Sequence, residues 1–182
     1  MKTKLLLFLI LGALLVCMSV PVAIVNAQIT YTLTLAVTGS GSTTPAVGAY
    51  AYDEGYVVNI AATPDNGWVF VNWTGDVADP NSANTSVTMN DNKIVTANFS
   101  QMTYTLTMAV TGSGSTTPAV GASPQYKYGD VVNITATPAN GWNFVNWSGY
   151  VADPSSPNTS ITMNGNRTVT ANFSQITYTL TM

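Results

Sequence analysis

The feature that most constrains this chain is an internal repeat that covers residues 28–182. Residues 28–100 and 101–174 both open with Thr-Tyr-Thr-Leu-Thr after two residues and close with Thr-Ala-Asn-Phe-Ser. The two copies are 73 and 74 residues long, and residues 175–182, QITYTLTM, begin a third. Self-similarity of this kind indicates an array of similar units. The sequence therefore predicts two repeat modules and, at 175–182, the first strand of a truncated third repeat.

The segment before the repeats has the features of a secretion signal. Two lysines precede an uncharged apolar run over residues 5–16, and the small residue Ala27 ends the segment. A basic region, an apolar region and a small residue at the cut are typical of a signal peptide. We expect a signal helix over residues 1–27 that is cleaved between Ala27 and Gln28, in phase with the repeat. The alternative is an uncleaved membrane anchor, because residues 5–25 are long enough to cross a bilayer.

Composition excludes most catalytic chemistry. The chain has no histidine, and its one cysteine, Cys17, lies in the signal segment. Lipidated cysteines usually follow Gly, Ala or Ser, whereas Val16 precedes Cys17, so we interpret it as a small apolar residue. Without histidine there is no Ser-His-Asp relay and no His-ligated zinc. Residues 28–182 carry three basic and eight acidic residues, which excludes a basic nucleic-acid footprint.

The same composition favours a folded chain. Only 7% of the residues are charged, whereas 46% are hydrophobic. A chain of this kind is not disordered through high charge and low hydrophobicity. Because cleavage would leave no cysteine, hydrophobic packing without disulfides must hold the modules together.

Alternation of apolar and polar residues predicts β-strands. Tyr31, Leu33, Leu35 and Val37 alternate with threonines and an alanine, which is typical of a half-buried strand. Similar alternation predicts further strands, with Pro- or Asn-Gly-type turns between several of them, at residues 57–63, 68–73, 86–89 and 94–99. No segment shows helical spacing over three turns. The sequence predicts an all-β fold of tandem small modules with about five strands each.

Large aromatic residues are the expected core of such small modules. Val69 becomes Asn143 in the second copy, so this face should meet solvent. The predicted core aromatics are therefore Trp68, Phe70, Phe99, Trp142, Phe144 and Phe173. Trp73 and Trp147 have the opposite parity: they either cap the other face or follow a bulge. Exposed, they would be platforms for sugar stacking; buried, they would be part of the core or its edge.

These motifs resemble the divergent internalin-B-type B-repeat, a bacterial surface repeat. The resemblance lies in VVNI-x-A-TP-x-NGW-x-FVNW-[ST]-G followed by TANF, and it covers essentially all of residues 28–182. It implies small β-rich modules, similar to a β-grasp, strung together in exported or cell-surface proteins. Such modules act as stalks or spacers or contribute to adhesion. The family supplies no catalytic residues.

Few acidic residues are candidates for chemistry. Asp53-Glu54 is the only adjacent acidic pair, and the second copy has Lys127-Tyr128 there, so we interpret the pair as a polar turn. Asp76 and Asp79 are weak calcium candidates, because calcium takes six to eight oxygen ligands and the second copy keeps only Asp153. Turn formation by Asp79-Pro80 is the favoured interpretation.

Eight Asn-x-Ser/Thr motifs make glycosylation a further hypothesis. They also arise by composition, since the strands are rich in Thr and Asn and the repeat doubles them. The motifs on faces expected to be polar, and therefore the candidate acceptors, are Asn98, Asn133 and Asn172.

We expect a non-catalytic structural or adhesive repeat module of an exported cell-surface or secreted protein, without a cofactor. The alternative is a carbohydrate- or calcium-binding accessory module of a larger extracellular protein. The expected partners are surface glycans or other surface proteins and not nucleic acid; a membrane would contact only an uncleaved signal segment. Residues 175–182 offer a route to strand exchange, by addition to a sheet edge of another molecule.

Overall fold

The computed structural model describes residues 28–182, and the predicted signal segment lies outside the described residues. These residues form fourteen strands and no helix, so the all-β prediction is confirmed. The strands of the first module are β1 (Thr30–Thr38), β2 (Gly41–Thr44), β3 (Gly48–Asp53), β4 (Val57–Pro64), β5 (Trp68–Thr74), β6 (Asn84–Thr88) and β7 (Lys93–Gln101). Those of the second are β8 (Thr103–Thr111), β9 (Gly114–Thr117), β10 (Gln125–Lys127), β11 (Val131–Pro138), β12 (Trp142–Ser148), β13 (Asn158–Thr162) and β14 (Arg167–Gln175).

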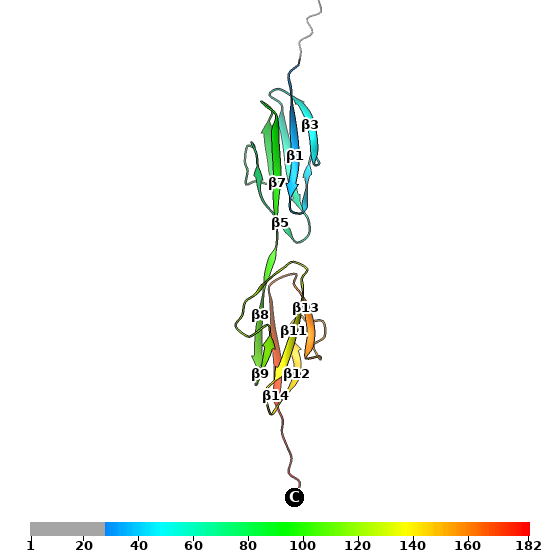
Figure 1. Cartoon of the computed structure of the whole chain (residues 1–182), viewed down its shortest axis with the longest axis vertical. Helices are drawn as coiled ribbons and strands as arrows, with labels where there is room; N and C mark the ends of the chain where they lie inside the picture. The colour runs from blue at the N-terminus through cyan, green and yellow to red at the C-terminus, as the bar shows by residue number, and fades with distance from the viewer. Residues whose placement is uncertain (1–27) are drawn as a thin grey trace, which may run out of the picture.

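Each module is a sandwich of two sheets. A four-stranded sheet of order β3-β1-β7-β5 packs on a three-stranded sheet of order β2-β4-β6, and β8–β14 repeat this order. The first and last strands, β1 and β7, pair in parallel at the centre of the larger sheet, and the other neighbours are antiparallel. The two modules follow one another along the long axis of the molecule (Figure 1). No helix within this part of the chain has the length and apolarity needed for a membrane crossing.

The arrangement differs from the expected one in strand number and in layers. Each module has seven strands where we predicted about five, and a second sheet where a β-grasp would place a helix against its single sheet. The additional strands, β2 and β3, lie between the first two predicted strands, where the sequence predicted none, and β9 and β10 lie at the corresponding place in the second copy. They have three to six residues each and are defined by pairing with distant strands, β2 with β4 and β3 with β1, and likewise β9 with β11 and β10 with β8.

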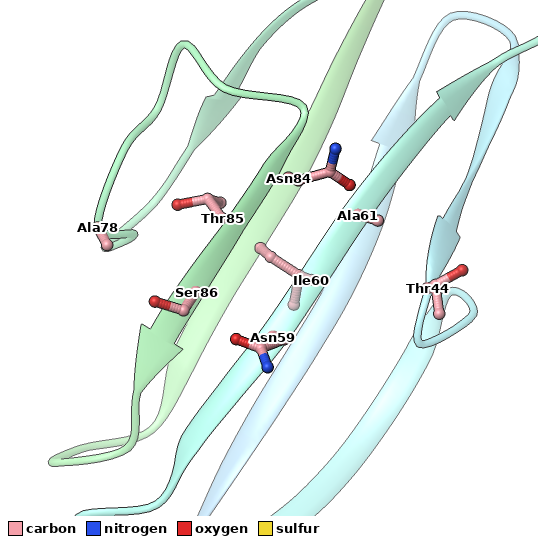
Figure 2. Close-up of a pocket in the computed structure, with 8 residues that line it drawn as sticks. All are labelled: Thr44, Asn59, Ile60, Ala61, Ala78, Asn84, Thr85 and Ser86. Carbon is pink, nitrogen blue, oxygen red and sulfur yellow. The ribbon is translucent and has the colours of Figure 1, made fainter.

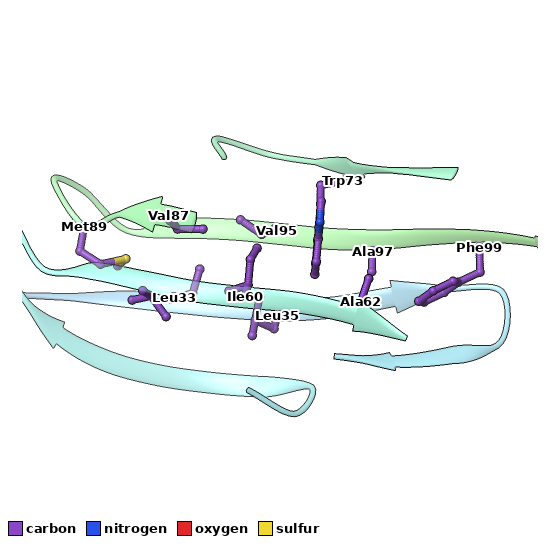
Figure 3. Packing of buried hydrophobic residues seen from close by; sticks show 11 residues of the cluster. Leu33, Leu35, Ile60, Ala62, Trp73, Val87, Met89, Val95, Ala97 and Phe99 are labelled. Carbon is purple, nitrogen blue, oxygen red and sulfur yellow. The ribbon is translucent and has the colours of Figure 1, made fainter. Parts of the chain in front are cut away.

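The core lies between the two sheets, and each module has its own. In the first module most buried side chains come from β1 and β7 of the larger sheet and from β4 and β6 of the smaller one, and Trp73 comes from β5 (Figure 3). Leu33, Val87 and Val95 are completely inaccessible to solvent. The outward positions of the same strands carry mainly Thr, Ser and Asn. The period of two predicted from the sequence thus separates core from surface, as expected for packed sheets.

A β-bulge in β5 turns Trp73 into the core. The register with β7 shifts between Phe70 and Asn72, so Val71 is an additional residue in the strand. Phe70 and Trp73 consequently lie on the same face, with ring centroids 5.8 Å apart. The Trp73 side chain is 1% exposed, and its Nε1–H donates to the Ser82 carbonyl at 3.0 Å. The indole therefore fills the core and also anchors the loop between β5 and β6.

The second module repeats this geometry, and its bulge places Trp147 in the core at 2% exposure. Both indoles are buried, which excludes the exposed sugar-stacking platform considered above. Of the aromatics predicted in the core, Phe99 and Phe173 are buried. The half-buried ones, which pack against the two core clusters, are Trp68, Phe70, Trp142 and Phe144.

We predict that Trp73→Ala lowers the free energy of unfolding of the first module by about 3–5 kcal/mol, because it leaves a cavity and an unpaired Ser82 carbonyl. Trp68→Ala, at a half-buried ring, should cost less. Urea denaturation of residues 28–182 provides the measurement. Val71→Ala, at the exposed residue of the same bulge, is the control. A cost for Trp73→Ala no greater than that of the control would contradict the assignment.

Candidate functional site

The two modules meet at a junction with a single connecting residue. Strand β7 ends at Gln101 and β8 begins at Thr103, so Met102 alone links them. The Met102 amide donates to the carbonyl of Gly67 at 2.8 Å, and Gly67 lies in the turn between β4 and β5 of the first module. The connection is thereby hydrogen-bonded to the end of the first module.

A tyrosine from the second module covers the same turn. The ring of Tyr128 lies against Gly67, and its hydroxyl accepts a hydrogen bond from Asn66 Nδ2 at 2.9 Å. Gly67 is buried and has φ of +80°, a conformation that side chains rarely adopt. A Cβ at this position would also overlap the tyrosine ring. The Asn-Gly sequence thus serves both the turn and the close approach of Tyr128.

The sequence did not identify this contact. It aligned Lys127-Tyr128 with Asp53-Glu54 only to argue that the repeat does not require the acidic pair, which we interpreted as a polar turn. The strand registers confirm the correspondence, since Thr30 is opposite Asp53 and Thr103 is opposite Lys127. The sequence did contain a signal for it: Tyr128 replaces Glu54 in a turn that is otherwise exposed, where an aromatic residue is unexpected.

A second candidate site is an open hollow on the outer face of the smaller sheet. In the first module it measures about 500 Å³, and it lies over β4 and β6 beside the β5–β6 loop (Figure 2). No lining side chain is ionisable; the lining residues are Thr44, Asn59, Ile60, Ala61, Ala78, Asn84, Thr85 and Ser86. The corresponding strands of the second module, β11 and β13, form a hollow of about 290 Å³, with Thr135 in place of Ala61. Amide and hydroxyl groups in these hollows suit a neutral polar ligand.

A comparison with family models covers most of the chain. The model described as the divergent InlB B-repeat domain matches twice, at residues 31–103 and 104–177. The chain belongs to the divergent InlB B-repeat family. A search of curated proteins and a search of solved structures found no match. The family occurs in extracellular or surface-associated bacterial proteins, in which its members are repeat modules.

The only adjacent acids of the B-repeat modules lie at the surface. Asp53 ends β3, and Glu54 follows in an exposed turn. Beside them Tyr52 and Tyr56 stack with ring centroids 5.3 Å apart. Burial, and next to it the neighbouring Tyr50 and Tyr56, raises the pKa of the Tyr52 hydroxyl. The phenol is therefore less acidic than an isolated one.

The weak calcium candidates of the first B-repeat have protein partners. Asp76 pairs with the ammonium group of Lys93, whose side chain is 8% exposed. In the second module Arg167 replaces Lys93 and lies over the ring of Tyr150, which replaces Asp76, at 4.5 Å from the ring centroid. Both modules thus place at this position a side chain that contacts the basic residue, a carboxylate in the first and an aromatic ring in the second. Among residues 28–182 no group of three or more acidic or cysteine side chains gathers as a metal site.

The second acid of the loop forms a turn in both B-repeats. Asp79 Oδ1 accepts from the Asn81 amide at 2.9 Å, and Asp153 Oδ1 accepts from the Ser155 amide at 2.8 Å. This is the side-chain-to-backbone geometry of an Asx turn. The Ser155 hydroxyl, together with that amide, holds the pKa of the Asp153 carboxyl below its ordinary value.

The candidate glycosylation sites differ in what their side-chain amides do. Asn98 Nδ2 donates to Asn72 Oδ1 at 2.9 Å, and Asn172 Nδ2 donates to Asn146 Oδ1 at 2.7 Å. Both lie on the central strands β7 and β14. Asn133, by contrast, is exposed on β11 at the rim of the smaller hollow.

In a host that modifies Asn-x-Ser/Thr motifs, we predict higher glycan occupancy at Asn133 than at Asn98 or Asn172. Modification occurs on Nδ2, which at the latter two sites is held in a hydrogen bond on a central strand. Glycopeptide mass spectrometry provides the measurement. Asn72→Ala removes the nearer of the two acceptors of Asn98 Nδ2, the other being Thr74 Oγ1 at 3.4 Å, and should raise occupancy at Asn98. Equal occupancy at all three sites would show that these hydrogen bonds do not govern modification.

Proposed function

We propose that this chain is a non-catalytic structural segment of an exported cell-surface protein, in which its B-repeat modules serve as a stiff spacer. The observation that carries the proposal is the junction. One connecting residue, a backbone hydrogen bond at Gly67 and the covering ring of Tyr128 together oppose bending between the modules. A flexible linker would instead allow the modules to move independently.

The family supports the setting of this role. Its members are surface repeat modules, and a surface repeat gains reach when successive units are aligned rather than freely jointed. The elongated arrangement of the two sandwiches agrees with such a role (Figure 1). In an adhesive protein, the same spacer would present a binding partner away from the cell.

We predict that Tyr128→Ala loosens the junction without unfolding either module, because Tyr128 lies outside both cores. Residues 28–182 contain no cysteine, so nitroxide labels can be attached after Val71→Cys and Val145→Cys, at exposed and equivalent bulge positions. Double electron–electron resonance should give a narrow distance distribution for the parent chain. In the variant the distribution should be about twofold wider, since the single linker residue is then less restrained.

The control is Tyr178→Ala, at a residue that is 89% exposed and outside the junction. It should leave the distribution unchanged. A broad distribution already present in the parent chain would refute the stiff spacer.

The polar hollows favour a second candidate function, the binding of neutral carbohydrate. Their recurrence at corresponding strands of both modules is the observation behind it. Asn and Ser side chains can donate and accept hydrogen bonds with sugar hydroxyls. This role is compatible with a spacer that also contributes to adhesion.

We predict that a neutral oligosaccharide that occupies the larger hollow raises the melting temperature of the first module. At 100 times its Kd, such a ligand adds about 2.7 kcal/mol to the free energy of unfolding. Ala61→Thr, which introduces the side chain present at residue 135, should reduce the shift by narrowing the hollow. A glycan panel screened by thermal shift tests both expectations. A shift that Ala61→Thr leaves unchanged would place the ligand elsewhere, and no shift with any glycan would remove the hypothesis.

A further inference from the structure

The second module has, at its end away from the junction, the same kind of turn that the first module has at the junction. Gly141 lies in the turn between β11 and β12, with φ of +78° against +80° for Gly67. The Ile176 amide donates to the Gly141 carbonyl at 2.8 Å, as the Met102 amide does to Gly67. The chain therefore leaves the second module with the same backbone hydrogen bond with which it leaves the first.

The two ends differ in what covers them. Gly67 is buried beneath Tyr128, whereas Gly141 is exposed, and a Cβ built on Gly141 meets no atom within 4 Å. Asn140 precedes Gly141 as Asn66 precedes Gly67. The second module thus presents the same turn with the same conformation, open where the first is occupied.

The segment that leaves this end has the sequence of a connected module. Residues 175–182 match residues 101–108 at every position except Ile176, which replaces Met102. Leu106 and Met108 are buried in the second module, whereas their counterparts Leu180 and Met182 are at least 83% exposed. Leu180 and Met182 thus occupy the sequence positions of two β8 core residues, but no core surrounds them.

The residue that covers the turn distinguishes the two modules. The Tyr128 amide donates to the Met102 carbonyl at 2.9 Å, and the Glu54 amide donates to the Ile29 carbonyl at the same distance. Positions 54 and 128 are therefore equivalent in their backbone. Glu54 is exposed and Tyr128 half buried. A glutamate cannot cover a glycine turn with a ring, and burying its charge there would be costly.

We propose that the end face formed by Asn140, Gly141 and Ile176 docks a further repeat module that presents a tyrosine where the second module presents Tyr128. The residue at this position then determines which module can follow another. A module of the second type, with tyrosine there, can follow either module. A module of the first type, with glutamate there, can only stand first in the array. The proposal rests on the spacer function above, since it assigns to a second end the joint that makes the first one stiff.

The test extends the chain by one module. Residues 109–174, added after Met182, complete a module of the second type, because residues 175–182 already supply its first strand. Labels at Val145→Cys and at the equivalent valine of the added copy report on the new junction, and the Val71→Cys and Val145→Cys pair reports on the old one. We expect two narrow distance distributions with the same mean. The matched control carries Tyr128→Glu in the added copy alone, and should lose the narrow distribution at the new junction only.

The outcomes separate the two proposals. A narrow distribution at the old junction with a broad one at the new junction would overturn the docking proposal and leave the spacer function standing. Broad distributions at both would overturn both. A new junction that stays narrow in the glutamate control would show that tyrosine does not select the following module.

A second measurement does not depend on whether the added module folds. Tyr128→Glu in residues 28–182 places the residue of the first module at the existing junction. We expect the Val71–Val145 distribution to broaden as it does in Tyr128→Ala. An unchanged distribution would contradict the rule that tyrosine, and not glutamate, closes this joint.

Discussion

Backbone pairing by one central strand holds each module together and also sets the direction of the next. Strand β7 pairs with β1 on one side and with β5 on the other, and its inward side chains Val95 and Ala97 are completely buried. The same strand then leaves the module and, after Met102, becomes β8. The last residues of β7 stay paired with β5 as far as Gln101, so the direction in which the chain enters the second module is fixed by a ladder of the first.

Alternation in the sequence was sufficient to predict the sheet faces but not the position of the tryptophans. Leu33 and Leu35 are buried, and Val69 and Ile94, which the second copy replaces with Asn and Thr, are exposed. Alternation did not place Trp73 correctly, because one additional residue in β5 moves every later side chain of the strand to the opposite face. The alternative of a bulge could be stated from the sequence, but its presence depends on pairing with β7, which lies about 25 residues further along the chain.

The junction could not be predicted for a similar reason. Its side-chain hydrogen bond joins Asn66 to Tyr128, 62 residues apart, and neither residue belongs to a strand. Each taken alone has a local explanation: Asn-Gly forms a turn, and Tyr128 follows a short strand. Only the stacking of the two modules brings them together. The repeat itself held the remaining clue, because differences between copies at exposed turns mark positions where the two modules have different neighbours.

The low charge of the chain bears on how such modules can be joined. The first module, residues 28–100, carries six acidic residues and one basic residue, whereas the second, residues 101–174, carries two of each and has no net charge. Long-range electrostatic forces between the two modules are therefore weak. A joint built from ion pairs would weaken as salt screens them. The joint observed here uses a backbone hydrogen bond, an amide-to-phenol hydrogen bond and a ring against a glycine. None of these carries a net charge. The stiffness of the junction should therefore change little with ionic strength.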